Sequence, residues 1–188
     1  AHIPGLKVVV PSDPYSAKGL LAASIRDDDP VFLVNDKKLI NLSGFVPDED
    51  YTIQLGKGRY LRNGNDITLV GMSYTSIVCK EAAEKLEADG ISCEVIDMMS
   101  LSPFDEDILI ESIKKTNNVV IVDEDTPRAS MASEFAAVIA DKGFDYLDSP
   151  IKRVTAPHSP VPYNRDLEKA FMPQPEDVVY SVKQVLGL

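Results

Sequence analysis

The sequence predicts an α/β fold: a three-layer α/β/α domain around a mostly parallel sheet, preceded by the tail end of another α/β domain. Two observations support this fold class. From residue 67 onward, short apolar runs alternate with segments of helical spacing, as in chains that build a parallel sheet with helices on both faces. Residues 1–34 contain a further strand, helix and strand, ahead of a loop-rich break.

The first segment begins with an apolar β run, Lys7 to Val10. Pro11-Ser12-Asp13-Pro14 then forms a turn and starts a helix that spans Tyr15 to Ile25. Pro30 opens a second apolar run, Val31 to Val34. Because the chain starts on a core strand without an initiating Met, we expect this segment to be the end of a longer domain.

A loop-rich stretch, residues 35–65, separates this segment from the regular pattern. Pro47-Asp48-Glu49-Asp50 is typical of a loop, and Asn63-Gly64-Asn65-Asp66 indicates a turn. Tyr51 to Leu55 could form a short strand between them.

The regular pattern begins with a nearly continuous apolar run, Ile67 to Met72, as expected of a strand covered on both faces. Residues 74–89 have helical spacing, and Gly90 suits the left-handed position that ends a helix. The next strand is expected over Ile91 to Met98. A strand, helix and strand of this length imply a right-handed crossover between parallel neighbours.

A second helix is expected from Ser102 to about Lys115, with Ser102 as the N-cap and Pro103 at the first helical position. A strand over Asn118 to Val122 and an Ala-rich helix over residues 130–142 follow.

The last predicted elements are a short strand and a helix. The strand covers Ile151 to Thr155, the Pro-rich residues 157–162 follow it, and the helix runs from about Glu176 to Leu186.

Composition excludes several classes of function. The chain has 188 residues, 44% of them hydrophobic and 26% charged, which is ordinary for a globular protein. Its formal net charge of −11 argues against nucleic acid as a partner and permits a basic protein partner. No apolar run approaches the roughly 20 residues that span a bilayer, so no membrane partner is expected. Cys79 and Cys93 lack metal-site spacing and are expected to be buried, reduced thiols.

Polar residues at the expected carboxyl ends of the strands are candidates for a site, because ligands of such sheets bind there. The loop Asp123 to Arg128, with three carboxylates and an Arg, is the most unusual of these. An interface or helix-cap role is favoured over catalysis, because no nearby group completes an acid/base pair. His158, between two prolines, is expected to pack in a loop rather than act as a base.

Several ordered segments carry a family resemblance. The runs PGLKVVVPSDPYSAKGLL, IRDDDPVFL and GISCEVIDMMSLSPFDEDILIESIKKTNNVVIVDE resemble the beta subunits of thiamine-diphosphate-dependent 2-oxoacid dehydrogenases. So does FDYLDSPIKRVTAPHSPVPYNRDLEKAFMPQPEDVV, and together these segments span almost the whole chain. The details VDEDTPRASMASE and TAPHSPVP look closest to acetoin dehydrogenases. The substrate itself (acetoin, pyruvate or a branched-chain 2-oxoacid) is not assigned by the sequence.

The resemblance implies a division of the chain. Residues 1–40 would be the C-terminal remnant of a pyrimidine-binding domain, residues 41–64 a linker, and residues 65–188 a transketolase C-terminal-like domain. It also implies that the intact enzyme uses thiamine diphosphate and magnesium. The family's metal motif, cofactor-activating carboxylate and active-site His all lie outside this sequence. We therefore assign no catalytic and no cofactor-binding residue, and expect this chain alone to bind neither cofactor and to be inactive.

Two sites follow from the resemblance alone. IRDDDP matches a segment that holds a structural potassium ion in some members, which implicates Ser24, Ile25, Asp27 and Asp29, largely through backbone carbonyls. The terminal carboxylate, here that of Leu188, takes part in some members in binding the acyltransferase core. Relatives commonly have Glu where this chain has Asn35.

The expected function is subunit assembly and docking in such an enzyme. The implied partners are the alpha subunit, a second beta subunit and the lipoyl acyltransferase core. The intact enzyme would cleave and oxidise its substrate and pass the acyl group to lipoamide. A bacterial cytoplasm is the expected location, with the mitochondrial matrix as a second option. The alternative is a stand-alone interaction module with the same fold and no catalysis.

Overall fold

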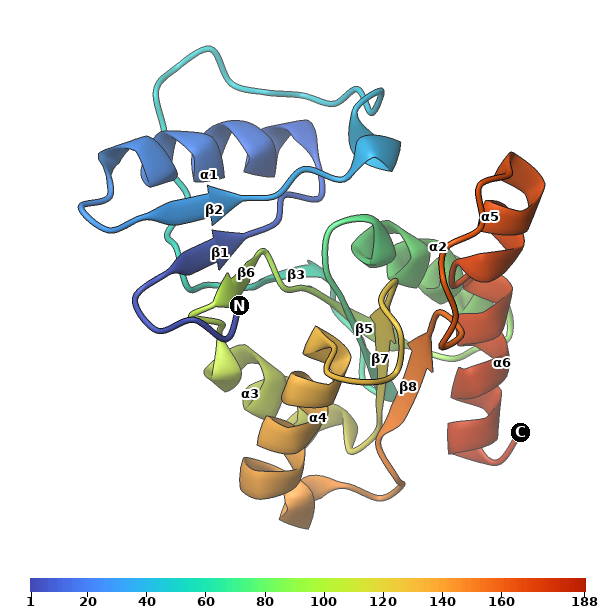
Figure 1. Ribbon diagram of the computed structural model, residues 1–188. Helices are drawn as coiled ribbons and strands as arrows, with labels where there is room; N and C mark the ends of the chain where they lie inside the picture. The colour runs from blue at the N-terminus through green and yellow to red at the C-terminus, as the bar shows by residue number, and fades with distance from the viewer.

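The computed structural model describes all 188 residues and contains two sheets, one small and one large (Figure 1). The small sheet has the strand order β2-β1-β6 and the large sheet the order β3-β5-β4-β7-β8. The strands are β1 (Lys7–Val9), β2 (Val31–Leu33), β3 (Arg59–Arg62), β4 (Ile67–Gly71), β5 (Cys93–Asp97), β6 (Ser100–Ser102), β7 (Val119–Asp123) and β8 (Lys152–Thr155).

The helices are α1 (Pro14–Arg26), α2 (Tyr74–Ala88), α3 (Glu106–Thr116), α4 (Met131–Lys142), α5 (Arg165–Phe171) and α6 (Pro175–Leu186). Two short 3₁₀ turns, η1 (Lys37–Leu39) and η2 (Phe144–Tyr146), complete the secondary structure. None of the helices combines the length and the apolar surface that crossing a membrane would need.

The large sheet is mostly parallel, as the sequence predicts. Strand β4 pairs in parallel with β5 and β7, and β7 pairs in parallel with β8. Only the edge strand β3 runs antiparallel to its neighbour, β5. Because the four parallel strands end at the same edge, the polar residues that follow them lie along one side of the sheet.

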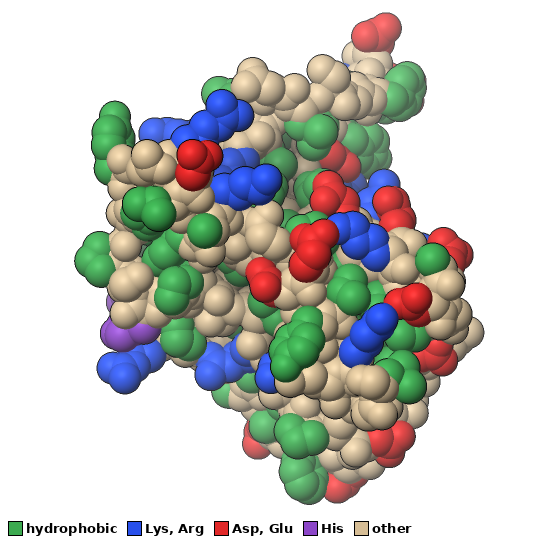
Figure 2. Space-filling view, turned by 90° about the vertical axis from the view of Figure 1, so that its right-hand side faces the viewer, with side chains coloured by type: hydrophobic (Ala, Val, Ile, Leu, Met, Phe, Trp, Pro, Cys, Tyr) green, Lys and Arg blue, Asp and Glu red, His purple; other side chains and the backbone are tan.

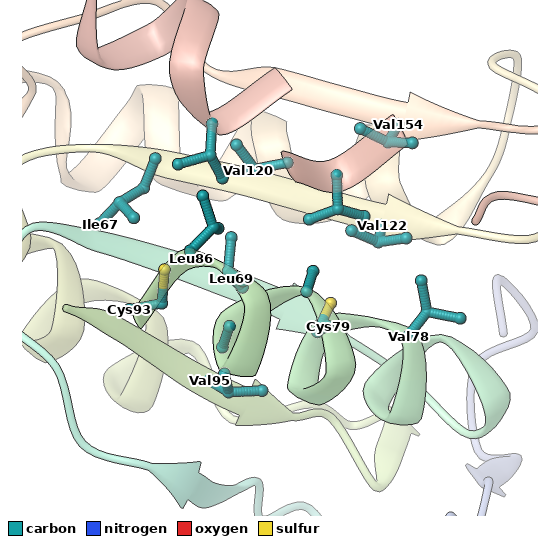
Figure 3. Packing of buried hydrophobic residues seen from close by; sticks show 14 of the residues in the cluster. Ile67, Leu69, Val78, Cys79, Leu86, Cys93, Val95, Val120, Val122 and Val154 are labelled. Atoms are coloured by element: carbon teal, nitrogen blue, oxygen red, sulfur yellow. The ribbon is translucent and has the colours of Figure 1, made fainter. Parts of the chain in front are cut away.

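Helices cover both faces of the large sheet and form the predicted three layers. On one face, α2 and α6 pack with side chains such as Val78, Leu86 and Val182 against Leu69 and Val122 (Figure 3). On the other face, α3 and α4 pack against the alternate side chains of the same strands. This arrangement explains why strand runs are continuously apolar, since each strand residue meets one helical layer.

The two cysteines are free and buried, as predicted. Cys79 lies on α2 and Cys93 starts β5, and both belong to the same apolar cluster (Figure 3). Burial raises the pKa of both thiols, in the case of Cys93 to about 12.

The small sheet joins the beginning of the chain to its middle. Strand β1 pairs in parallel with β2 and antiparallel with β6, which comes after β5 in the chain. Helix α1 covers this sheet, and Val9, Leu20 and Met99 form its small core. Asp13 caps α1 by accepting from the N–H of Ser16 at 2.7 Å. The helix start that the sequence predicts is thus present.

Two local predictions are wrong. Ser102 does not cap a helix, because it lies in β6 and its hydroxyl donates to the carbonyl of Leu6 at 3.1 Å. Pairing with β1 keeps the chain extended there, so α3 begins at Glu106.

The stretch Tyr51 to Leu55 is not a strand either. Its apolar side chains Ile53 and Leu55 pack against the small core, and the N–H of Ile53 donates to the carbonyl of Gly19. The apolar side chains of this stretch therefore pack beneath α1 without sheet pairing.

Candidate functional site

A cluster of polar side chains lies where the small sheet meets the carboxyl edge of the large sheet. We call Ser12, Asp13, Arg59, Ser76 and Asp97 the polar junction. Ser12 and Asp13 come from the turn between β1 and α1, and Arg59 from β3. Ser76 lies in the first turn of α2, and Asp97 is the last residue of β5. The junction thus joins four elements that are far apart in the sequence.

Asp97 is the centre of the polar junction and has no exposed surface. Its Oδ1 accepts from the Ser76 hydroxyl at 2.7 Å. Its Oδ2 accepts from the Ser12 hydroxyl at 2.5 Å and from Nε of Arg59 at 3.0 Å. Both carboxylate oxygens therefore have donors, as a buried charge requires.

Arg59 connects this buried carboxylate to the turn that precedes α1. Its Nη2 donates to the Ser12 hydroxyl and to Oδ2 of Asp13, both at 2.8 Å. Because Asp13 also caps α1, the guanidinium fixes the start of that helix to the edge strand of the large sheet.

The pKa values of the two carboxylates of the polar junction, Asp97 and Asp13, shift in opposite directions. Burial raises the pKa of Asp97, and the charge of Arg59 and the two serine hydroxyls oppose that rise. Burial also acts on Asp13, but the hydrogen bonds of Ser16 and the charge of Arg59 hold the pKa of Asp13 below its ordinary value. Burial by itself would lower the pKa of the Arg59 guanidinium, but the charges and hydrogen bonds of Asp97 and Asp13 together raise it.

The turn between β4 and α2 makes a second contact between the large sheet and the turn that precedes α1. Ser73 has a φ of 48°, outside the usual region for a serine, and its hydroxyl donates to the carbonyl of Pro11 at 3.1 Å. The approach of β4 to α2 needs a glycine, because a Cβ on Gly71 would lie 2.7 Å from Cα of Ser76. This close approach places Ser73 and Ser76 at the edge of the sheet.

The polar junction is built to hold two parts of the chain together. Its serine hydroxyls, carboxylates and guanidinium are engaged with one another, so it presents no base next to a free nucleophile. The sequence argument missed Arg59 and Asp97. The available signal was the presence of two acidic residues, Glu94 and Asp97, inside the largely apolar run Ile91 to Met98.

The acidic loop after β7 makes a helix-cap contact, which is one of the two roles that the sequence favoured over catalysis. Asp123 is buried and accepts from the N–H groups of Asp125 at 3.0 Å and Ala132 at 2.9 Å. The latter bond satisfies a free N–H at the start of α4. Burial raises the pKa of Asp123. Arg153 on β8 donates to the carbonyl of Pro127 at 2.8 Å, which holds the loop further.

The four residues of the implied potassium site lie together at the end of α1. The carboxylates of Asp27 and Asp29 both contact the Lys7 ammonium, at 2.7 and 3.1 Å. These hydrogen bonds raise the pKa of Lys7 and lower that of Asp27. The Ser24 hydroxyl donates to the carbonyl of Leu20 at 2.7 Å, and Ile25 is exposed. The side-chain oxygens of Asp27 and one oxygen of Asp29 thus serve ion pairs with Lys7.

The other predicted positions lie apart from the polar junction. Leu188 is exposed at the end of the chain beyond α6, and its N–H donates to the carbonyl of Lys183 at 2.9 Å. His158 is exposed in the Pro-rich loop after β8. No three His, Cys, Asp or Glu side chains come together as a metal-binding group.

Two family models match the chain. The model described as "Transketolase, C-terminal domain" matches residues 56–178, and the model described as "Transketolase, pyrimidine binding domain" matches residues 1–42. The polar junction therefore connects the parts of the chain that these two models cover.

Curated relatives match nearly all of the chain. The acetoin:2,6-dichlorophenolindophenol oxidoreductase subunit beta of Bacillus subtilis is 52% identical over 98% of this chain and 54% of its own length. The 2-oxoisovalerate dehydrogenase subunit beta of the same organism is 42% identical over 98% of this chain and 57% of its length. The pyruvate dehydrogenase E1 component subunit beta of Rickettsia felis is 40% identical over 98% of this chain and 57% of its own length. The chain spans about half the length of these relatives.

Solved structures agree on the fold. A split-gene transketolase, described as an inactive beta4 tetramer, matches with a TM-score of 0.83 and 27% identity over 100% of this chain and 59% of its own. A transketolase from Pichia stipitis matches with a TM-score of 0.68 at 13% identity, over 99% of this chain and 26% of its own, which shows the fold alone.

Proposed function

Because this chain belongs to the family of beta subunits of acetoin and 2-oxoacid dehydrogenases, we propose that it serves as the C-terminal part of such a subunit in a thiamine-diphosphate-dependent enzyme. Its role there is subunit assembly and docking to the lipoyl acyltransferase core. The assembled enzyme would cleave and oxidise acetoin, pyruvate or another 2-oxoacid and transfer the acyl group to lipoamide.

The observation that carries this proposal is the polar junction itself. Its polar groups bond to one another and so fix the segment before α1 to the carboxyl edge of the large sheet. Ligands of such folds usually bind at this edge. A region that is committed to holding two family domains together suits an assembly role and leaves the chemistry to residues outside this chain.

The residues of this chain do not fit thiamine diphosphate and its magnesium ion. A bound diphosphate and a divalent ion need several oxygen ligands and anion-binding donors at one place. No such group of ligands comes together here, and Asp97 and Asp13 are already engaged by Arg59. We therefore propose that this chain alone binds neither group and has no turnover.

We place a potassium ion, where the enzyme uses one, at the end of α1. The carbonyls of Ser24, Ile25, Asp27 and Asp29 would contribute, because a helix end leaves carbonyls without intrahelical donors. The Lys7 ammonium already neutralises the nearby carboxylates, which favours a site made of carbonyls.

The proposed partners are the alpha subunit, a second beta subunit and the acyltransferase core. The exposed end of the chain at Leu188 is available for the last of these. Acidic and basic side chains are interspersed on the face seen in Figure 2, with hydrophobic side chains between them, which permits a partner that contacts both charges. The bacterial relatives favour a cytoplasmic location, and a mitochondrial relative from Dictyostelium discoideum is the second option.

Turnover assays test this proposal. The purified chain, supplied with thiamine diphosphate and magnesium, should reduce a dye with neither acetoin nor pyruvate as the substrate. Measurable cofactor-dependent turnover by the chain alone would overturn the proposal. Native protein of only this length, purified without an alpha subunit, would support a stand-alone interaction module instead.

A further inference from the structure

A cavity of about 560 Å³ lies between η1 and α5 and is separate from the polar junction. Its lining includes Lys38 of η1, Arg165 and Lys169 of α5, and Tyr74, the first residue of α2. The pyrimidine-domain model covers Lys38, whereas the C-terminal-domain model covers the other three residues. The cavity therefore lies where the two parts of the chain meet, beyond the carboxyl end of β4, and small ligands of α/β proteins often bind at such places.

Part of the cavity's lining is apolar and fixed by packing. Met172 lines the cavity and is buried with Phe171 in a small apolar cluster, against which Tyr74 packs. Gln174 holds the end of α5, because its Nε2 donates to the carbonyls of Lys169 and Met172, both at 2.9 Å. The cavity thus offers an ordered apolar surface next to charged side chains.

The three cations of this cavity, Lys38, Arg165 and Lys169, form no ion pair with any carboxylate of the chain. This is unusual here, because the chain has 30 acidic and only 19 basic side chains, and more than half of the basic ones do form ion pairs. The Lys38 ammonium instead lies over the ring of Tyr74, with Nζ 4.8 Å from the ring centre. All three cations are therefore available to an anion from outside the chain.

Two carboxylates, Asp166 and Glu168, also line the cavity. Both stand in the first turn of α5, where a negative charge favours the helix. The charged lining thus has three cations and two carboxylates, an excess of positive charge on a chain with a formal net charge of −11. Because no three carboxylate, His or Cys side chains come together as a metal-binding group, the cavity suits an anion that needs no divalent ion.

We propose that this cavity binds a small organic phosphate monoester, with the phosphate next to the three cations and the apolar part of the ligand on Tyr74 and Met172. A phosphate dianion has three acceptor oxygens, which suit one planar guanidinium and two ammonium groups together. A monocarboxylate has one charge and two oxygens, so it would engage fewer of these donors. The site consists only of residues of this chain and is independent of the proposed function.

Titration of the whole chain with phenyl phosphate, followed by NMR of the backbone amides, tests the site directly. We expect saturable shifts in η1, in the first turn of α2 and in α5, the elements that line the cavity. Phenylacetate has the same ring with a single negative charge and should bind at least several-fold more weakly. High salt should weaken the binding of phenyl phosphate, because the cations that hold it are exposed.

Substitutions on α5 test which charges hold the ligand. Arg165→Gln removes one of the three cations from an exposed position and should weaken the binding of phenyl phosphate roughly tenfold. Glu168→Gln removes a carboxylate from the lining and should strengthen binding. Lys80→Gln is the matched control, because Lys80 is an exposed cation on α2 that forms no ion pair and does not line the cavity. It should leave the affinity unchanged.

Several results would overturn the proposal. The first is the absence of saturable shifts in the parent protein, or shifts outside the elements that line the cavity. The second is equal binding of phenyl phosphate and phenylacetate, which would exclude selection of a dianion. The third is an equal effect of Arg165→Gln and Lys80→Gln, which would mean that phenyl phosphate responds only to the overall charge of the chain. The amide spectrum of each variant shows independently that it is folded.

Discussion

Arg59 and Asp97 face each other directly across β3 and β5, with Nε of the guanidinium 3.0 Å from Oδ2 of the carboxylate. The carboxylate has no exposed surface, whereas about a quarter of the Arg59 side chain (24%) is exposed. A buried carboxylate depends on its partner, because its own hydration has been lost. This pair therefore fixes the edge strand, and through Ser12 and Asp13 it fixes the start of α1 as well.

Arg59→Met should destabilise the protein strongly. It leaves the Asp97 charge buried without its cationic partner, and such changes typically cost about 3–5 kcal/mol. The matched control is Arg62→Met on the same strand, whose partner Glu87 is 67% exposed, so its loss should cost about 1 kcal/mol or less. Urea unfolding of both variants measures the difference. Equal losses would show that the polar junction has no special role.

Asp13→Asn tests the charge of Asp13 separately from the hydrogen bond by which this residue caps α1. The Asn oxygen can still accept from Ser16, but the ion pair with Arg59 is lost, at a cost of about 1 kcal/mol at pH 7. Because the pKa of Asp13 is lowered in the folded state, this stability is present above the ordinary aspartate pKa and is lost as the pH falls below it. The variant and the parent should therefore converge in acid. The urea unfolding midpoints of both proteins should be measured from pH 7 to pH 3. A difference between the two midpoints that stays constant over this range would contradict this account.

Gly71→Ala should disturb the turn between β4 and α2. The new Cβ would lie 2.7 Å from the Ser76 backbone, and crowding of this kind typically costs about 1–3 kcal/mol. Gly44→Ala is the control, because its Cβ would come no closer than 3.4 Å to Pro14. Thermal unfolding should show a lower midpoint for the first variant only. A similar midpoint for Gly71→Ala and the parent would mean that the turn can relax.

The two thiols should be unreactive in the folded protein. Cys79 and Cys93 are buried, and burial raises the pKa of both, so little thiolate is present near pH 8. An aromatic disulfide reagent should label neither cysteine in buffer and both in denaturant. Rapid labelling of the folded protein at either position would show that the cluster around α2 opens readily.

The regular part of the fold could be predicted from the sequence because its signals are local. The runs that became β4, β5 and β7 are apolar throughout, and α2, α4 and α6 show helical spacing close to their observed bounds. Strand β3 was missed because Arg59 to Arg62 has two arginines and a tyrosine, and it forms only by pairing with β5 at the edge. Ser102 was misassigned for the same reason, since its pairing with β1 is a contact between distant segments.

The candidate site was predictable only in part. Asp123 follows an apolar strand directly and precedes a helix, so its cap role could be proposed from local sequence. The partnership of Asp97 with Ser12, Ser76 and Arg59 joins four elements, and no local pattern specifies which of them meet.

Association with an alpha subunit is the measurement that tests the central claim most directly. The chain should be produced together with the alpha subunit from the same organism and analysed by size-exclusion chromatography with light scattering. We predict that both proteins elute in one complex, and that Arg59→Met weakens this complex more than Arg62→Met. Elution of the chain by itself at its own mass of 20.6 kDa, with a folded spectrum and no bound alpha subunit, would contradict the assignment as a subunit part.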